Sequence, residues 1–392
     1  MSHTFFLNEV IQLQKLGLTI DTASINNPDR DFAAMSAIEQ VEAQRTLYIK
    51  SGGAKKAISS LLDALLHKPS VLVRGLSHSL RLGNGSPSAT LKSLFYAVEA
   101  LILGSWMRKH GHSHLHVHFG GPVASVALLC AQMWDVSYSI TIHGPDEFFD
   151  IEKFHLSEKI SQAAMVLCIS NYCRSQLMRI TNPVHWDKMH VVHLGVDPAL
   201  FVPAIKSNAN DVVQIACVGR LVPAKGQMIL LKACLALRTK GVNFHLRMVG
   251  NGTDRHELEA FAQEHSLPVT FEGSRTHAEI LEFLNVTDIF VLASFAEGVP
   301  VALMEAMSMQ VPCVSTKIAG IPELIRDGID GFLVSASAVD ELENALERLI
   351  ADSALRSKFG KSAREQVLNE FNLPKNAQLL ADTFAEFFEK GA

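Results

Sequence analysis

Two glutamates with seven residues between them, Glu297 and Glu305, form the most suggestive chemical pattern in the chain. The apolar run at 289–292 predicts a buried strand that ends just before them, and Pro300 is well placed as the first residue of a helix. Glu297 then precedes this helix and Glu305 falls in its second turn. The pattern predicts two carboxylates around a helix N-terminus at the end of a strand.

The start of this predicted helix could hold an anion. The amides of Val301, Ala302 and Leu303 have no acceptor within the helix, so they are available to a phosphate. Carboxylates beside a phosphate suit a nucleotide sugar, because each can accept hydrogen bonds from a pair of hydroxyls. The plain alternatives are that Glu297 only offsets the helix dipole and that Glu305 is an exposed helix residue.

A second strand-to-helix loop, at 219–226, carries two cations, Arg220 and Lys225. It follows the apolar run at 215–218, so it is expected at the carboxyl edge of a parallel sheet, where α/β proteins bind ligands. Arginine and lysine there can neutralise a diphosphate. Gly250 lies in a third such loop, whose GxG lacks the third glycine of a dinucleotide-binding fingerprint. The alternative is a pair of solvated loops.

In the first half of the chain, the apolar run at 138–142 predicts a strand that ends in His143, followed closely by Asp146. A histidine at the end of such a strand could hydrogen-bond a sugar hydroxyl or assist a proton transfer. A lone histidine in a strand is more often structural, so that interpretation stays open.

Histidines alternate with other residues from His110 to His118. His114, His116 and His118 would share one face of a strand, which raises the question of a metal site. The run holds no cysteine or acidic ligand, and neutral histidines at the end of a strand explain it as well. We therefore expect no metal here. The GxSxG motif of a serine hydrolase is absent from the sequence.

Short apolar runs alternate with helical patterns along the chain, which predicts parallel sheets with helices on both faces. A turn at 195–198 and a polar stretch at 203–211 predict a domain boundary. We expect a first domain at 1–195, a second at 196–373 and a final helix at 374–392 that could cross back to the first domain.

The N-terminus departs from this pattern. Ser2 and Thr4 resemble helix N-caps, so a helix is predicted at 4–16 with a strand at 18–23 after it. A doubly wound domain normally opens with a strand. We therefore expect the first domain to lack its first strand, or the sequence to start after it.

The net charge of −5 argues against a nucleic-acid binder. Residues 1–195 hold 17 Lys and Arg against 15 Asp and Glu, whereas the rest holds 18 against 25. The first part is thus the better candidate for anionic partners such as phospholipid, although ordinary surface variation explains the difference too. Six scattered cysteines in apolar surroundings and the absence of a basic leader predict a cytoplasmic protein.

Together these motifs are similar to those of family 4 of the retaining glycosyltransferases, in the branch that builds bacterial exopolysaccharide and lipopolysaccharide, including colanic-acid-type polymers. The resemblance covers residues from about 138 to 335. It rests on Glu297 with Glu305, the loop 219–226, His143 with Asp146, and the segments 192–201 and 320–331.

The resemblance implies an α/β GT-B fold, in which two Rossmann-like parallel-sheet domains face each other across a cleft. It implies transfer of a sugar from a UDP- or GDP-sugar with retention of configuration, with no cofactor and no essential metal. Arg220 and Lys225 would hold the donor diphosphate, helped by the amides of Val301 and Ala302 and the turn at Gly250.

The same resemblance assigns the remaining roles. Glu305 would grip the ribose, Glu297 would orient the transferred sugar, and His143 would contact that sugar. On the acceptor side it implies a set of four residues, namely Ser2, His3, His118 and Asp146. The acceptor would be a glycan or a polyprenyl-linked oligosaccharide, reached by peripheral contact with the inner face of the plasma membrane.

Two other classes of function remain open. A nucleotide-sugar epimerase can share the fold, and a non-catalytic partner subunit can retain it. The sequence identifies neither the donor sugar and its base nor the acceptor.

Overall fold

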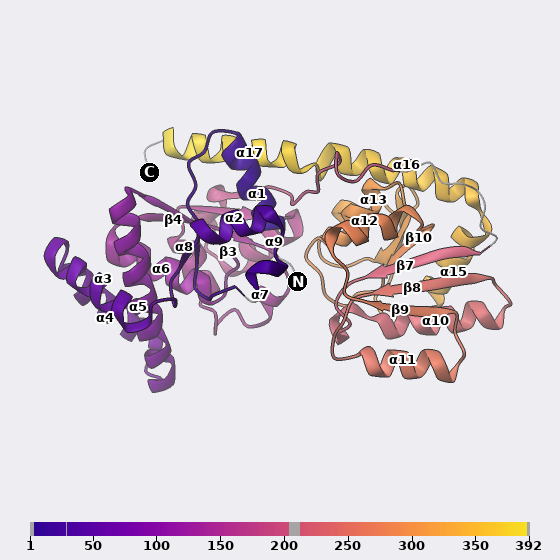
Figure 1. Ribbon diagram of the computed structural model, residues 1–392, viewed down its shortest axis with the longest axis horizontal. Coiled ribbons are helices and arrows are strands. Elements are labelled where there is room, and N and C mark those ends of the chain that lie inside the picture. Colours follow the sequence, from indigo (N-terminus) through magenta and orange to yellow (C-terminus); the bar gives the residue numbers. More distant parts are fainter. Residues whose placement is uncertain (1–3, 29, 204–211, 390–392) are drawn as a thin grey trace. The chain divides into compact units, whose positions relative to one another are not determined.

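A computed structural model describes residues 4–28, 30–203 and 212–389 of the chain (Figure 1). These residues form two compact units. Unit 1 comprises the described parts of Met1–Ile169, Cys173–Val192 and Gln378–Ala392, and unit 2 those of Ser170–Tyr172 and His193–Ala377.

Unit 2 is built on six parallel strands in the order β12-β11-β10-β7-β8-β9. The strands are β7 (Val213–Val218), β8 (Phe244–Val249), β9 (Val269–Gly273), β10 (Ile289–Leu292), β11 (Cys313–Thr316) and β12 (Gly331–Val334). The chain runs outward from β7 through β8 and β9, then returns to the other side of β7 at β10. This reversal leaves a crevice at the carboxyl ends of β7 and β10, the usual ligand position in such sheets.

The strands β7 and β10 lie where the apolar runs at 215–218 and 289–292 predicted them, and the fully buried β10 contains only apolar residues. The connecting helices are η3 (Pro223–Lys225), α10 (Gln227–Thr239), α11 (Arg255–Glu264), α12 (His277–Asn285), α13 (Val301–Ser308), α14 (Ile321–Leu324), α15 (Val339–Ala351) and α16 (Ser353–Glu370).

Unit 1 has a parallel sheet in the order β3-β4-β5-β6. Its strands are β3 (His114–His118), β4 (Ser137–Ile142), β5 (Met165–Cys168) and β6 (Met189–Val191). The helices along this part of the chain are α6 (Pro122–Trp134), α7 (Asp146–Phe149), α8 (Leu156–Gln162), α9 (Asn171–Ile180) and η2 (Pro183–Lys188). All six cysteines of the chain are buried thiols that take part in no disulfide bond among the described residues, as expected for small apolar side chains.

The segment before this sheet differs from the prediction in one respect. The helix α1 (Thr4–Lys15) is where it was expected, but the strand predicted at 18–23 is wrong. Leu18 and Ile20 instead pack on a small cluster of α1, β5 and α17, and the Gln14 side chain donates to the carbonyl of Ile20. Only β1 (Ala23–Ser24) pairs, in parallel, with β2 (Leu47–Tyr48). The short helices η1 (Phe32–Ala34) and α2 (Ala37–Arg45) lie between them.

Three further helices of unit 1 stand beside the sheet: α3 (Gly53–His67), α4 (Ser70–Gly83) and α5 (Pro87–His110). The last helix, α17 (Leu373–Glu389), is shared, because residues from Gln378 onward belong to unit 1. There Leu380 and Phe384 pack against Leu13 and Leu167. In the described part of the chain, no helix is both long and apolar enough to cross a membrane.

Candidate active site

Three loops of unit 2 meet at the crevice beside β7, and their backbones touch. The Gly219 amide donates to the Val249 carbonyl at 3.0 Å, and the Leu221 amide donates to Asn251 at 3.0 Å. A Cβ added to Gly250, which has a φ of +140°, would lie 1.9 Å from the Gly219 carbonyl. Glycine at 250 is therefore required by the close approach of two backbones. Its predicted role as a tight turn beside the ligand loop agrees with this geometry.

The loop before α13 is tied to the loop after β7. The amides of Phe295 and Ala296 both donate to the Ala224 carbonyl, at 2.8 and 3.2 Å. The buried hydroxyl of Thr316 donates to the Ser294 carbonyl at 2.7 Å, which anchors the same loop to β11. These bonds bring together two segments that lie more than 70 residues apart in sequence.

Lys225 and Glu297 form an ion pair at this junction. The Lys225 Nζ lies 2.6 Å from Oε1 of Glu297, and the Ser294 hydroxyl donates to the same oxygen at 2.7 Å. The Glu297 side chain is only 7% exposed and that of Lys225 is 20% exposed. A carboxylate so enclosed needs its partners, because an unpaired buried charge is costly. The pair thus fixes the positions of both predicted donor-site residues.

The remaining predicted cation lies beside them. Arg220 follows β7 directly and its side chain is exposed, while its carbonyl accepts a 2.8 Å hydrogen bond from the buried Gln227 side chain. Because its backbone is anchored and its guanidinium is exposed to solvent, Arg220 is well placed to bind a phosphate.

The helix α13 begins one residue later than predicted. Pro300 is its N-cap, with extended dihedral angles, and Val301 is the first helical residue. The Leu303 amide already donates to the Pro300 carbonyl at 3.2 Å, so the expectation that it is available to a ligand is wrong. The amides of Val301 and Ala302 precede the first amide that donates within the helix, which leaves them as the candidates for an anion.

Glu305 lies in the second turn of α13 with its side chain only 13% exposed. The His277 ring lies nearby, with its Nδ1 3.7 Å from Oε1, and burial lowers the pKa of this ring, which favours its neutral form. Burial raises the pKa of Glu305 to about 7. The idea that Glu305 is merely an exposed helix residue is therefore wrong. A buried acceptor with so few partners suits a ligand that donates hydroxyl hydrogen bonds.

Replacing Glu305 with glutamine should stabilise the ligand-free protein at high pH. Because the folded pKa lies above the ordinary value of 4.5, the folded state binds more protons between these two values, and stability falls as pH rises through that window. We expect Glu305→Gln to raise the free energy of unfolding by about 2 kcal/mol at pH 8, and to change it little at pH 4. Urea unfolding at both pH values measures this.

The matched control is Glu282→Gln, a change at an exposed glutamate of α12. It should leave the pH dependence of stability unchanged. Identical pH dependence in the wild type and the Glu305→Gln variant would show that burial of Glu305 carries no such cost.

In unit 1, His143 ends β4 and belongs to a chain of polar contacts. Its Nε2 lies 3.0 Å from Nδ1 of His118, and Nε2 of His118 lies 3.3 Å from Oε1 of Glu9. His143 is 8% exposed and its ring packs near that of Phe119. The two histidines predicted for this site are thus brought together. Glu9, on α1, is the member that sequence reasoning missed.

A second missed group holds the backbone around His143. Both Glu147 oxygens accept amide hydrogen bonds, one from Gly120 and the other from His143 at 2.6 Å and Gly144 at 3.0 Å. Lys159 donates to the carbonyls of Gly120 and Gly121 at 2.7 and 2.9 Å.

Burial shifts both of these ionisable groups. It raises the pKa of Glu147 and lowers the pKa of Lys159 to about 7. The sequence signal that was available for Glu147 is its position three residues after Gly144, in the segment Gly-Pro-Asp-Glu. The position of Lys159 depends entirely on tertiary packing.

The other predicted acceptor-side residues are less informative. Asp146 is exposed at the first position of α7. Ser2 and His3 lie outside the described residues.

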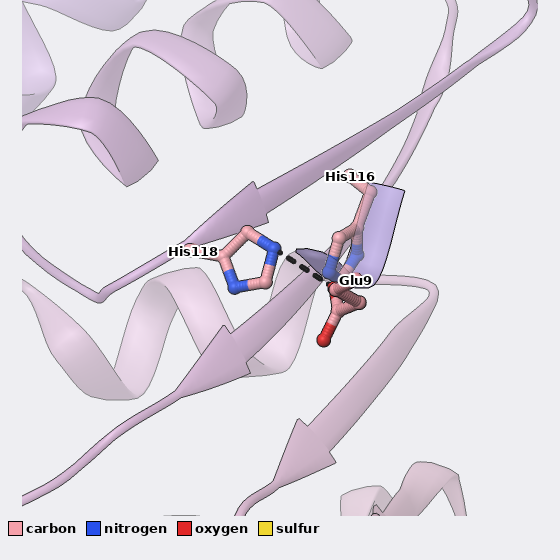
Figure 2. A group of neighbouring side chains, drawn as sticks. All are labelled: Glu9, His116 and His118. Carbon is pink, nitrogen blue, oxygen red and sulfur yellow. Dashed lines mark ion pairs between the residues drawn. The ribbon is translucent and has the colours of Figure 1, made fainter. Parts of the chain in front are cut away.

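The histidines of β3 are grouped differently from a convergent row. His114 packs against aromatic rings of α17, whereas His116 and His118 gather with Glu9 (Figure 2). Their ligand atoms lie within 4.8 Å of one another, and two histidines with one carboxylate is a set that binds metals. Both ring nitrogens of His116 already pair, however, with the hydroxyls of Ser139 and Thr141 at 2.7 and 3.0 Å.

Burial also lowers the pKa of His116 far below its ordinary value, so this ring is neutral at physiological pH. Neutral histidines satisfied by hydroxyls need no ion to be stable. The arrangement is therefore compatible with the expectation of a metal-independent protein, which stays a prediction.

The fold and the crevice of unit 2 define a glycosyltransferase of the GT-B class. Residues 56–200 match a family model described as Glycosyltransferase Family 4, and residues 203–366 match one described as Glycosyl transferases group 1. The chain therefore belongs to the family 4 glycosyltransferases, as the sequence motifs predicted.

Similar proteins support this assignment. The chain is 27% identical to the amylovoran biosynthesis glycosyltransferase AmsK of Erwinia amylovora, over 95% of this chain and 93% of that one. It is also 27% identical to the putative colanic acid biosynthesis glycosyltransferase WcaL of Escherichia coli, with the same coverage. It is 28% identical to an Escherichia coli UDP-Gal:alpha-D-GlcNAc-diphosphoundecaprenol alpha-1,3-galactosyltransferase, over 51% of this chain and 54% of that one.

Solved structures confirm the predicted fold. A glycosyltransferase from Rickettsia africae superposes with a TM-score of 0.72 at 17% identity, covering 100% of this chain and 97% of that one. Anabaena HepE in complex with UDP superposes with a TM-score of 0.65 at 19% identity, covering 74% of this chain and 82% of that one.

Proposed function

We propose that this protein is a retaining, metal-independent glycosyltransferase that moves a sugar from a UDP- or GDP-sugar to a glycan or polyprenyl-linked oligosaccharide acceptor during synthesis of a cell-surface polysaccharide. The observation that carries the proposal is the ion pair of Lys225 and the buried Glu297 beside the exposed Arg220. These residues lie at the point where the strand order of the unit 2 sheet reverses, between β7 and β10. The carboxylate can accept hydrogen bonds from the sugar hydroxyls of a donor, and the adjacent cations can bind its diphosphate.

The names of similar proteins support the substrates. The AmsK and WcaL relatives are assigned to polysaccharide biosynthesis, and the galactosyltransferase relative is named for a UDP-sugar donor and a diphosphoundecaprenol acceptor. The HepE structure contains UDP. A nucleoside diphosphate sugar and a lipid-linked acceptor are therefore the substrate classes to test first.

The proposed binding mode uses the side chains as they stand. Arg220 and Lys225 neutralise the diphosphate, with the amides of Val301 and Ala302 as further donors. The Glu305 carboxylate accepts hydrogen bonds from the ribose hydroxyls.

The sugar and the leaving group complete the scheme. Glu297, held by Ser294 and Lys225, accepts hydrogen bonds from hydroxyls of the transferred sugar, and His143 contacts the same sugar. The departing phosphate takes the proton of the acceptor hydroxyl, so no strong protein base is required. Positioning and charge stabilisation then provide most of the rate enhancement.

A donor screen followed by product analysis tests the proposal. A nucleotide sugar that binds only the folded protein raises its melting temperature, which selects the donor. Transfer to a lipid-linked acceptor, with no product from donor alone, is the expected result. An epimerised free donor would support the epimerase alternative, and a chain that binds no nucleotide sugar would support the non-catalytic alternative.

Turnover should persist in excess EDTA. The donor diphosphate is neutralised by Arg220 and Lys225 in this proposal, so no divalent cation is needed to compensate its charge. We expect the transfer rate in excess EDTA to stay within about twofold of the untreated rate. A rate that collapses with EDTA and returns with Zn²⁺ would contradict this and direct attention to Glu9, His116 and His118.

We further propose that the protein acts in the cytoplasm, as a peripheral protein on the inner face of the plasma membrane. A polyprenyl-linked acceptor is embedded in that membrane, so the enzyme must approach the bilayer surface to reach it. An acidic chain of net charge −5 needs a local basic or apolar surface to do so.

A further inference from the structure

The helices α3, α4 and α5 of unit 1 expose many large apolar side chains. A helix exposed to water normally buries its large apolar residues and exposes polar ones. Small or polar residues occupy every buried position of α3 and several of those on α4 and α5, which also bury larger residues such as Leu82, Leu101 and Met107. Many of the large apolar residues of these helices are therefore left outside the core.

The large apolar residues of these helices face outward. The exposed fraction is 54% for Leu62, 79% for Leu66 and 72% for Val73. Leu61, Leu65, Leu76, Leu80, Leu91 and Phe95 are exposed as well. An apolar patch this extensive usually marks an interaction surface. Small residues between helices with large apolar ones outside is the arrangement of helices that face lipid.

Tight polar contacts allow this arrangement. The buried Asp63 of α3 accepts hydrogen bonds from Ser105 at 2.8 Å and from Arg108 on α5. A Cβ on Gly75 would lie 2.9 Å from the side chain of Met133, so α4 rests directly on α6 at that point. The three helices are thus held without using the outer leucines, which leaves those side chains available to a partner.

The same helices are strongly basic. Residues 53–110 contain eight Lys and Arg and only two acidic residues, Asp63 and Glu99. Both acids are already paired, Asp63 with Arg108 and Glu99 with Lys50. The segment therefore carries a net charge of +6 in a chain whose net charge is −5, so the rest of the chain carries −11. Positive charge concentrated among exposed leucines is complementary to an anionic, apolar partner.

A groove within this surface shows how the two properties combine. It has a volume of about 480 Å³ and is lined by two lysines, three apolar residues, a serine and an acid, namely Lys55, Lys109, Ile58, Leu62, Leu66, Ser59 and Asp63. The acid, Asp63, is already paired with Arg108. Two lysines can contact a phosphate while the leucines accept the start of a hydrocarbon chain.

We propose that the outer face of α3, α4 and α5 binds the surface of an anionic phospholipid bilayer, with a lipid phosphate between Lys55 and Lys109 and with Leu62 and Leu66 among the acyl chains. The proposal deepens the peripheral location proposed above and rests on it for its biological purpose. The helices lie on the bilayer, because none of the described helices is apolar and long enough to cross it.

Flotation of the full-length protein with vesicles tests this surface. We expect binding to vesicles that contain phosphatidylglycerol and much weaker binding to vesicles of pure phosphatidylcholine. The double variant Leu62→Ser/Leu66→Ser should lower the partition coefficient by at least about tenfold, because two exposed leucines would no longer be buried in lipid. Lys55→Glu/Lys109→Glu should lower it on anionic vesicles only, and 1 M salt, which shortens the Debye length to about 3 Å, should do the same.

The control is Val184→Ser, which removes an apolar side chain that is 75% exposed elsewhere in unit 1. It should bind vesicles like the wild type. UDP-induced thermal stabilisation should be the same in all variants. A protein that binds vesicles but no nucleotide would contradict the proposed function while still supporting the lipid-binding surface. Unchanged vesicle binding in both double variants would overturn the lipid proposal. The proposal would also be overturned if the wild type is a dimer and Leu62→Ser/Leu66→Ser makes it a monomer without affecting vesicle binding.

Discussion

Replacing Glu297 with alanine or Lys225 with alanine should abolish sugar transfer. Each change removes one partner of the 2.6 Å ion pair that orients the proposed sugar and diphosphate contacts. Groups aimed at transition-state charge in an enclosed site are worth much more than the same groups in water, so we expect kcat/KM to fall by at least about 1,000-fold. Initial rates of transfer with the donor selected by thermal shift measure the effect.

Folding must be separated from catalysis in these variants. Lys225→Ala leaves Glu297 buried without its cation, which could cost about 3 kcal/mol or more of stability. Glu297→Gln avoids this problem, since the amide oxygen can still accept the hydrogen bond from Ser294. It should melt near the wild-type temperature and remain inactive.

The matched control is Lys240→Ala, which removes a lysine of the same unit that pairs with Glu343 and Glu347 and is 45% exposed. Exposed pairs contribute little, so its activity and stability should stay near the wild type. Full activity in both Lys225→Ala and Glu297→Ala would show that the donor site has been misassigned.

His143→Ala should lower kcat by about 100-fold or more, because loss of one hydrogen-bond donor that acts in the transition state has an effect of this size. UDP binding should change little, since His143 and the proposed nucleotide contacts belong to different compact units. Steady-state kinetics with isothermal titration of UDP separates the two quantities.

Glu9→Gln tests the chain of contacts behind His143. Glu9 contacts His118, which in turn contacts His143, so we treat Glu9 as a positioning residue. We expect a smaller loss in kcat of about tenfold with unchanged UDP affinity. Glu152→Gln, an exposed glutamate of the same unit, is the control and should have no effect. Equal activity of His143→Ala and the wild type would remove His143 from the site.

Much of the donor half could be predicted from sequence because its residues lie in short local patterns. The strand at 289–292, the position of Glu297 before α13 and that of Glu305 within it all follow from apolar runs and a proline. Parallel strands place their carboxyl ends on one edge, which is where the loop at 219–226 was expected, and the loop at 294–300 follows another predicted strand. Their actual contact, through the Ala224 carbonyl, is a property of the folded sheet.

The local patterns were less reliable at the ends of elements. Pro300 caps α13 instead of starting it, which assigns the Leu303 amide to a protein carbonyl. The strand predicted at 18–23 is wrong because Leu18 and Ile20 pack, partly buried, against a cluster formed by α1, β5 and α17. Alternation of apolar residues cannot distinguish a strand from a loop packed on helices.

Residue types and short spacings were sufficient to indicate the class of this protein, since they place two carboxylates, two cations and a histidine after predicted strands. Which of these groups touch depends on the folded structure. It paired Lys225 with Glu297, enclosed Glu305 enough to shift its pKa, and joined Glu9 to His118. The physical reason is that electrostatic interactions depend on distance and burial, and both are set by segments far apart in the chain.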